Sequence, residues 1–354
     1  MKESIFDLME EKELDAVLVS DGYNMRYHSG FCGATGYLYL SRSRKVLTTD
    51  SRYTTQAREE APDYEVAEIG GSLGYGDVIA KLMREDGVKR IGFEDTQFIY
   101  ADFVSLRNKC PGAEWAGLGE SLNRLRCIKT PEELEKIAKA EEIGDLAFKR
   151  ILEDVRPGVS ELFLAARLDY YMRELGAESN SFDTIMASGL HSAMPHAIPS
   201  AKKLELGDFV TMDFGCHYKG YCSDMTRTIV LGHANEKQKE VYRIVLEAQT
   251  AAIEALCAGK TGREVDAVAR GIIGKAGYGD YFGHGLGHSV GLFIHEAPSL
   301  SPKCEEVLRE NITMTVEPGI YVPGFGGVRI EDLVVITETG CKNLTHSPKE
   351  LIEL

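Results

Sequence analysis

The chain has 354 residues, 44% of them hydrophobic and 27% charged, which is the composition of a globular protein large enough for two domains. Its formal charge of -15 argues against nucleic acid and anionic membranes as partners, because both require a basic face. Eight scattered cysteines, an acidic N-terminus unlike a signal peptide, and no apolar stretch of ~20 residues predict a cytoplasmic protein that does not span a membrane.

The first part of the chain alternates short apolar runs with amphipathic segments, which is typical of an α/β domain with a mixed sheet. The runs expected to form strands are residues 15–21, 36–40, 45–50, 64–70 and 90–95. The segments expected to form helices are residues 3–12, 51–61, 73–86 and 99–109.

A strong helix start marks a domain boundary near residue 125. Thr130 is a good N-cap, and Pro131 suits the first helical position. We therefore expect one domain over residues 1–125 and a second over 126–354. In the second domain, helices are expected at 131–154, 159–174, 236–258 and 261–276, and strand-rich stretches at 181–231 and 282–338.

Two hairpins in the second domain each carry a pair of acidic residues within apolar runs. Asp213 and Asp224 lie about equally far from a turn around residues 217–220, so they should face each other across the ladder or sit one step apart. Glu317 and Glu331 lie about equally far from a second turn at Gly324. A lone acid of this kind is usually exposed, but clustered buried acids need a strong cation, most naturally a metal.

The stretch GHGLGHSVGLFIHE, residues 283–296, adds three histidines. Its glycines disfavour a helix. In an extended strand His284 and His288 share a face, so that one imidazole can complete a metal site while the other meets a substrate. His295 follows on the same stretch.

Together these motifs resemble the pita-bread metallopeptidases, and among them the Xaa-Pro branch that contains aminopeptidase P and prolidase. The resemblance is carried by PHAIPS, the DFG…SDMTRT spacing, GHGLGHSVGLFIHE, EPGIY and VRIED, and by TTDSRYTTQA at residues 48–57. It implies the α+β class, with a creatinase-type (ribonuclease H-like) N-terminal α/β domain followed by a pita-bread α+β catalytic domain.

The resemblance also implies two divalent metal ions per chain, manganese first, with cobalt or zinc as alternatives. Carried over residue by residue, the metal ligands are Asp213, Asp224, His288, Glu317 and Glu331. The substrate-facing positions are those of His196, His284 and His295, and the supporting positions are those of Tyr321 and Arg329. Four carboxylates and one imidazole form an oxygen-rich set that suits manganese.

In such a site a hydroxide that bridges the two ions attacks the scissile carbonyl. Glu317 is then the proton shuttle, and His196 and His295 donate hydrogen bonds to the oxyanion. His284 would hold the substrate on its leaving side, and Arg329 would lock the ligand carboxylates.

We expect a Xaa-Pro aminopeptidase that acts on peptides with proline at the second position and forms a homodimer, as related proteins commonly do. The alternative is a Xaa-Pro dipeptidase (prolidase), although dipeptidases of this size often carry an arginine shortly after H-E-x-P, where this chain has Ser299. Methionine aminopeptidases usually lack this N-terminal domain and Arg329. Creatinase and non-catalytic pita-bread peptide-binding proteins usually lack the full ligand set, which is intact here.

Overall fold

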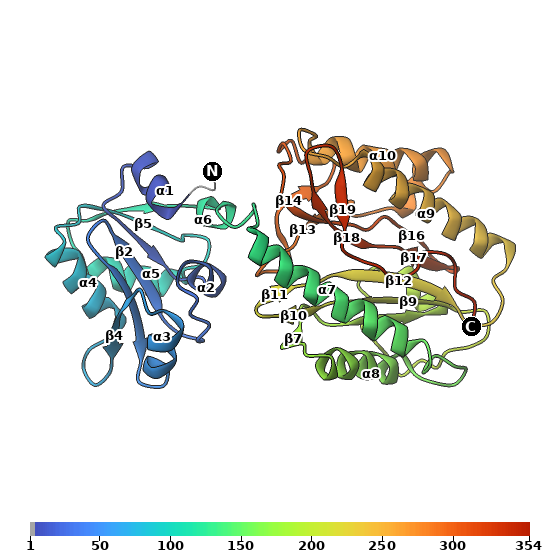
Figure 1. Ribbon diagram of the computed structural model, residues 1–354, viewed down its shortest axis with the longest axis horizontal. Coiled ribbons are helices and arrows are strands. Elements are labelled where there is room, and N and C mark those ends of the chain that lie inside the picture. Colours follow the sequence, from blue (N-terminus) through green and yellow to red (C-terminus); the bar gives the residue numbers. More distant parts are fainter. Residues whose placement is uncertain (1–3) are drawn as a thin grey trace. The chain divides into compact units, whose positions relative to one another are not determined.

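The structure is a computed structural model that describes residues 4–354. It contains two compact units, the first ending at Arg126 and the second covering Cys127–Leu354. Both are built from helices packed against β-sheets (Figure 1).

The N-terminal unit has a six-stranded mixed sheet in the order β4-β3-β2-β1-β5-β6. Strands β1, β2 and β3 pair antiparallel, whereas β3–β4, β1–β5 and β5–β6 are parallel. The strands are β1 (Ala16–Val19), β2 (Tyr37–Ser41), β3 (Lys45–Asp50), β4 (Glu65–Ile69), β5 (Arg90–Phe93) and β6 (Glu114–Gly117). The five predicted strands are confirmed, and β6 was missed because its four residues are only half-buried and lack an apolar run.

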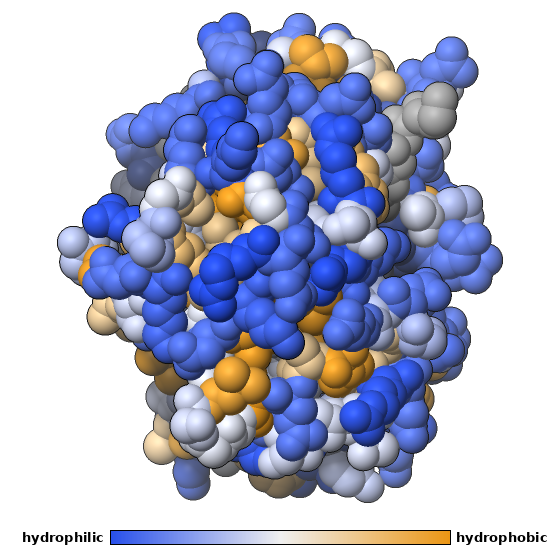
Figure 2. Space-filling model, turned by 90° about the vertical axis from the view of Figure 1, so that its left-hand side faces the viewer, coloured by the Kyte–Doolittle hydropathy of each residue, from blue (hydrophilic) through white to orange (hydrophobic). Residues whose placement is uncertain are grey.

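Helices cover both faces of this sheet. Along β1, Val17 and Val19 join a core with α1, α2 and α3, while Ala16 and Leu18 join a core with α4 and α5. The helices are α1 (Ile5–Glu11), α2 (Gly22–Ser29), α3 (Thr54–Glu60), α4 (Tyr75–Glu85), α5 (Tyr100–Lys109) and α6 (Ser121–Arg124). The four predicted helices are present, but the predicted start at residue 3 lies outside the described residues. The face of this unit seen in Figure 2 is mainly hydrophilic, with hydrophobic residues in small separate areas.

The C-terminal unit consists of two helix–sheet halves. Helices α7 (Pro131–Ile151) and α8 (Glu161–Glu174) pack on the sheet β12-β9-β8. Helices α9 (Glu236–Ala255) and α10 (Gly262–Lys275) pack on the strands of the sheets β15-β18-β19 and β16-β17. The two helix pairs lie on opposite sides of the strands (Figure 1), so the strands of both halves meet inside the unit.

The strands of this unit are two to six residues long. They are β7 (Ser179–Asn180), β8 (Ile185–Ser188), β9 (Phe209–Phe214), β10 (Cys216–Tyr218), β11 (Tyr221–Cys222), β12 (Met225–Val230), β13 (Gly287–Ser289), β14 (Glu296–Leu300), β15 (Thr313–Val316), β16 (Gly319–Val322), β17 (Gly326–Arg329), β18 (Asp332–Ile336) and β19 (Cys341–Asn343).

The long helices begin where the sequence predicts. The Thr130 side chain accepts a hydrogen bond from the backbone N–H of Glu133, and the Glu133 carboxylate accepts one from the backbone N–H of Thr130. Similar capping boxes start α9 and α10. All eight cysteines lie among the described residues, and none of them forms a disulfide. Within residues 4–354, no helix combines the length and the apolar character that crossing a bilayer requires.

Candidate active site

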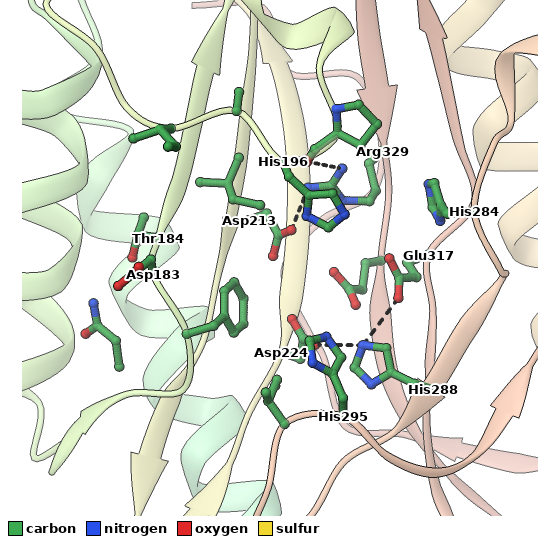
Figure 3. A pocket seen from close by; sticks show the side chains of 18 of the residues that line it. Asp183, Thr184, His196, Asp213, Asp224, His284, His288, His295, Glu317 and Arg329 are labelled. Carbon is green, nitrogen blue, oxygen red and sulfur yellow. Dashed lines mark hydrogen bonds and ion pairs between the residues drawn. The ribbon is translucent and has the colours of Figure 1, made fainter.

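A cavity of about 930 Å³ lies in the C-terminal unit where the two halves meet. Every predicted site residue except Tyr321 lines it, and Tyr321 contacts two that do. The histidines and carboxylates point toward one another from different strands and loops (Figure 3). The structure therefore brings the whole predicted set together.

The first hairpin carries Asp213 and Asp224 on one face. It turns at Lys219 and Gly220, both of which have positive φ (49° and 82°). Because this turn lies one residue later than the midpoint between the aspartates, Asp213 pairs with Thr226, and Asp224 precedes Thr226 by two residues. The predicted register, facing or one step apart, is wrong by one residue, but the two-residue offset keeps both carboxylates on the same face.

The second hairpin places its two glutamates opposite each other. The pairs on either side of them, Val316 with Asp332 and Gly319 with Arg329, have the same register. Glu317 and Glu331 therefore stand across from one another, as their equal distance from the turn predicts.

Three of these carboxylates form a tight buried cluster. Oxygen atoms of Asp213, Asp224 and Glu331 all lie within 4.8 Å of one another. The Thr226 hydroxyl donates to Glu331 Oε2 over 2.6 Å. Asp213 Oδ1 is buried and has no hydrogen-bond partner among the described atoms. An acceptor-only atom in that position is suited to a cation.

Burial and mutual repulsion act on the protonation of this cluster. Burial, and then the neighbouring carboxylates Glu331 and Asp213, raise the pKa of Asp224 well above its usual value. Burial and Glu317 do the same for Glu331. The pKa of Glu317 rises to about 8 through burial, although Arg329 opposes the shift. A divalent cation would offset both the repulsion and the lost hydration, so the residues fit a metal.

His288 presents a lone pair to the same space. Its Nδ1 lies 3.1 Å from the backbone carbonyl of Ser289, which can only accept, so Nδ1 carries the proton. Its Nε2 lies 3.5 Å from both Asp224 Oδ2 and Glu317 Oε1. Burial lowers the pKa of His288 to about 4, which keeps the imidazole neutral. A neutral nitrogen facing two carboxylates is the arrangement of a metal ligand.

Arg329 begins a hydrogen-bonded chain behind the carboxylates. Its guanidinium donates to Asp213 Oδ2 at 2.5 Å and to the Tyr321 hydroxyl at 2.7 Å. The Tyr321 oxygen lies 3.0 Å from His284 Nε2, and His284 Nδ1 lies 2.8 Å from the carbonyl of Gly285. Because that carbonyl must accept, His284 Nε2 accepts from Tyr321. Burial lowers the pKa of His284 to about 4, so this chain orients a neutral ring.

The remaining predicted histidines stand on either side of the carboxylates. The ring of His295 lies 4.6 Å from that of His288, edge to face, and burial followed by His196 lowers its pKa. His196 is exposed to the cavity, and the preceding Pro195 carbonyl accepts from Arg329 at 3.3 Å. His284 does not belong to a strand as predicted, because β13 begins only at Gly287.

Three residues that support the site were not predicted from the sequence. Thr226 joins Arg329 to Glu331 through its hydroxyl. Thr315 donates to Glu317 Oε1 at 3.1 Å, and Glu141 of α7 accepts from the backbone of Asp224 at 3.2 Å. The alternation of strand residues could have revealed Thr226 and Thr315, which lie two residues from Asp224 and Glu317. Glu141 lies far away in the sequence and carries no such signal.

The other side of the cavity is largely apolar. Asp183 and Thr184 lie across it from Glu317 and His284 (Figure 3). The apolar residues that line the cavity include Leu162, Ala165, Ala166, Phe182, Ile185, Ile198 and Pro199. Such a wall can hold an apolar ring by shape and contact.

Comparison with known proteins agrees with this geometry. The model of "Metallopeptidase family M24" matches residues 135–338, and that of the "Creatinase/Prolidase N-terminal domain" matches residues 2–128. A Xaa-Pro dipeptidase of Pyrococcus furiosus is 42% identical over 99% of both chains. Two solved structures are also similar. A Xaa-Pro dipeptidase from Bacillus anthracis is 45% identical, with a TM-score of 0.95 over 98% of this chain and 97% of that one. An X-Pro aminopeptidase from Thermotoga maritima is 40% identical, with a TM-score of 0.92 over 98% of this chain and 100% of that one.

These matches confirm the predicted family and the predicted α+β fold class. They include relatives named as dipeptidases and as aminopeptidases, and the former predominate among the similar proteins. With both domain models matched and the site residues assembled around one cavity, the chain belongs to metallopeptidase family M24 and carries a creatinase/prolidase N-terminal domain.

Proposed function

We propose that the protein is a Xaa-Pro dipeptidase, a prolidase, which hydrolyses the bond before proline in dipeptides. This reverses the preference for an aminopeptidase that Ser299 suggested. The support comes from the relatives of 41–42% identity that are named Xaa-Pro dipeptidases and cover nearly the whole chain. The observation that carries a metal-dependent hydrolysis is the buried cluster of Asp213, Asp224 and Glu331, with its unpartnered oxygen, beside the lone pair of His288.

In this proposal the residues that would hold two divalent ions, manganese first, are Asp213, Asp224, His288, Glu317 and Glu331. When bound, the ions would supply Lewis-acid polarisation of the scissile carbonyl and of the attacking water. The side chains of the protein hold the ligands and the substrate in place and move the proton.

Glu317 is the proposed proton carrier. The Thr315 hydroxyl holds its Oε1, so the exchange would use Oε2. The imidazole rings of His295 and His196 would each donate one hydrogen bond to the carbonyl oxygen as negative charge develops on it. His284, fixed by Tyr321, would contact the substrate on its leaving side. Arg329 would keep Asp213 in one orientation.

A proline ring suits the apolar wall of the cavity. The proline nitrogen of the scissile bond has no hydrogen to donate, so its recognition depends on shape and apolar contact. Phe182, Ile185 and Ile198 line the same cavity and supply such a surface.

One observation favours the aminopeptidase as a second candidate. Arg329 is the only lysine or arginine among the described residues that line the cavity, and its guanidinium is already bonded to Asp213 and Tyr321. The carboxylate of a dipeptide would then depend on neutral donors, such as the hydroxyls of Ser299 and Ser301, which lie 3.1 Å apart on the cavity wall.

Paired substrates separate these activities. The metal-stripped chain is reloaded with Mn²⁺, Co²⁺ or Zn²⁺ and given Leu-Pro, Leu-Pro-Ala and, as a control, Leu-Ala. We expect Leu-Pro to be cleaved at least about tenfold faster than the other two. Cleavage of Leu-Pro-Ala without Leu-Pro would establish an aminopeptidase, and metal-dependent binding of both without cleavage would indicate a peptide-binding protein.

The domain limits 1–125 and 126–354, the cytoplasmic location and the homodimer are also part of this proposal. Light scattering on the purified chain tests the dimer directly. A monomeric mass at micromolar concentration would contradict it.

A further inference from the structure

A buried lysine contacts the strand pair β13–β14, next to which two of the site histidines lie. The side chain of Lys129 is only 1% exposed, and that of its partner Glu296 is 2% exposed. Lys129 Nζ lies 3.1 Å from Glu296 Oε2 and 3.1 Å from the Ser289 hydroxyl. The backbone of Lys129 is itself anchored, since its N–H donates to the carbonyl of Asn311 over 2.8 Å.

The two residues that Lys129 holds are partners across one short ladder. Ser289 of β13 pairs with Glu296 of β14, and His288 pairs with Ser299. The register shifts between His288 and Ser289, so this ladder contains a bulge at the point where Lys129 bridges it. Backbone pairing over so few residues specifies the register weakly, and the ammonium adds a fixed connection between the two strands.

The two histidines neighbour these residues in the chain, His288 within β13 and His295 in the loop just before β14. His288 directly precedes Ser289, and His295 directly precedes Glu296. Ser289 and Glu296 contact Lys129, whereas the residue directly before each of them lines the cavity, so fixing one side of this segment also orients the other. Both histidines line the cavity beside Asp224 (Figure 3).

Glu296 also holds the loop between the two strands. Its Oε1 accepts from the backbone of Phe293 at 3.2 Å. Its carboxylate packs against Gly291 so closely that a Cβ there would lie 2.4 Å from Oε2. The Lys129–Glu296 pair therefore fixes β13, the loop and β14 together.

A buried ion pair is a poor source of net stability, because removing both charges from water costs about as much as their attraction returns. In some proteins a buried polar or charged group instead selects one strand or helix register over the alternatives. We propose that Lys129 is a positioning residue whose ammonium, through Ser289 and Glu296, sets the register of β13 against β14 and so aims His288 and His295 into the cavity. The inference rests on the proposed function, because it takes His288 to be a metal ligand.

Three variants of the full chain test the proposal. Ser289→Ala removes one contact of the ammonium and leaves the charges paired. Lys129→Met removes the ammonium, and Lys129→Met/Glu296→Met removes both charges and leaves apolar side chains of similar volume. Lys139→Met is the matched control, because Lys139 forms an exposed pair with Glu142 at 2.8 Å.

The readouts are calorimetric Mn²⁺ binding to the metal-stripped chain, thermal unfolding, and kcat and KM for Leu-Pro. We expect the double variant to regain the thermal stability that Lys129→Met loses, yet to bind Mn²⁺ at least about tenfold more weakly than the unmodified chain and to show a lower kcat. Ser289→Ala should weaken Mn²⁺ binding about threefold with unchanged unfolding, and Lys139→Met should change nothing.

The proposal would be overturned if Ser289→Ala and the double variant both kept the Mn²⁺ affinity and kcat of the unmodified chain. The Lys129–Glu296 ion pair would then have no role in positioning the histidines. His288→Ala separates this result from a failure of the proposed function. If His288→Ala still binds two Mn²⁺ ions with unchanged affinity, the ligand assignment itself is wrong. If His288→Ala loses binding while the Lys129 variants keep it, only the positioning role is refuted.

Discussion

Asp213 is bound on one side and open on the other: its Oδ2 lies 2.5 Å from Nη2 of Arg329, while its Oδ1 is buried with no hydrogen-bond partner among the described atoms. The guanidinium is a permanent cation, and it forms a buried ion pair with this carboxylate. Asp213 also contributes a carboxylate oxygen to the cluster with Asp224 and Glu331. One carboxylate thus joins the protein's own cation to the proposed metal.

Replacing Arg329 by methionine should destabilise the metal-stripped protein by about 3 kcal/mol, because it leaves Asp213 buried without its cation. Urea unfolding of the metal-stripped chain measures the change. Arg52→Met is the control, since Arg52 forms an exposed pair with Asp50 and should alter stability by less than about 0.5 kcal/mol. Equal stability of Arg329→Met and the unmodified chain would show that the pair contributes nothing.

Asp224→Asn and His288→Ala should abolish turnover of Leu-Pro and strongly weaken Mn²⁺ binding, because each removes a proposed ligand donor. Asp224→Asn should not destabilise the metal-stripped protein, since burial and neighbouring carboxylates already raise the pKa of this aspartate and disfavour its charged form. Thermal unfolding with and without Mn²⁺ checks both the loss of metal binding and the unchanged stability of the metal-stripped Asp224→Asn chain. Mn²⁺ should raise the unfolding temperature of the unmodified chain and not that of the variants. Most of the activity surviving in either variant would refute the ligand assignment.

The metal-stripped protein should lose stability as the pH rises from about 6.5 to about 8, above the range in which the lowered pKa values of His284 and His288 act in the opposite direction. Burial raises the pKa of Glu141 and of Glu317 to about 8, so over this range the folded chain keeps protons that the unfolded chain has released. Stability therefore falls by up to ~1.4 kcal/mol per pH unit for each group, and is fully present only below the unfolded pKa.

Glu141→Gln isolates one of these two contributions. The amide stays neutral at every pH and keeps an oxygen for Thr345 or for the backbone of Asp224. Urea midpoints between about pH 6.5 and 8 should therefore fall less steeply in this variant than in the unmodified chain. A metal-stripped chain whose stability rises over the same interval would contradict the assignment of both groups.

Much of this architecture could be predicted because local patterns determine it. Alternation in the strands and the Thr130 cap needed only neighbouring residues, and the equal spacing of Glu317 and Glu331 about their turn gave their register. For Asp213 and Asp224 the same reasoning missed by one residue, because the left-handed pair Lys219–Gly220 fixes the turn and spacing alone could not locate it.

Contacts between distant parts of the chain were not predictable in this way. Glu141 reaches the backbone of Asp224 from a helix, and Lys129 reaches Glu296 from the segment that precedes that helix. No periodicity connects such positions, and a buried lysine or glutamate resembles an exposed one in sequence until packing is known. The supporting contacts of the site therefore became visible only with the structure.

Tyr321→Phe should lower kcat for Leu-Pro about tenfold with little change in Mn²⁺ affinity. The Tyr321 hydroxyl bonds Arg329 and His284 and none of the proposed metal ligands, so its loss frees His284 without altering the metal's donors. Tyr242→Phe is the matched control, because it removes another buried hydroxyl, bonded to the Lys349 carbonyl, away from the cavity. Steady-state rates and calorimetry on both variants decide the matter: a Mn²⁺ affinity that falls together with kcat would mean that the chain from Arg329 supports the metal ligands and not the substrate.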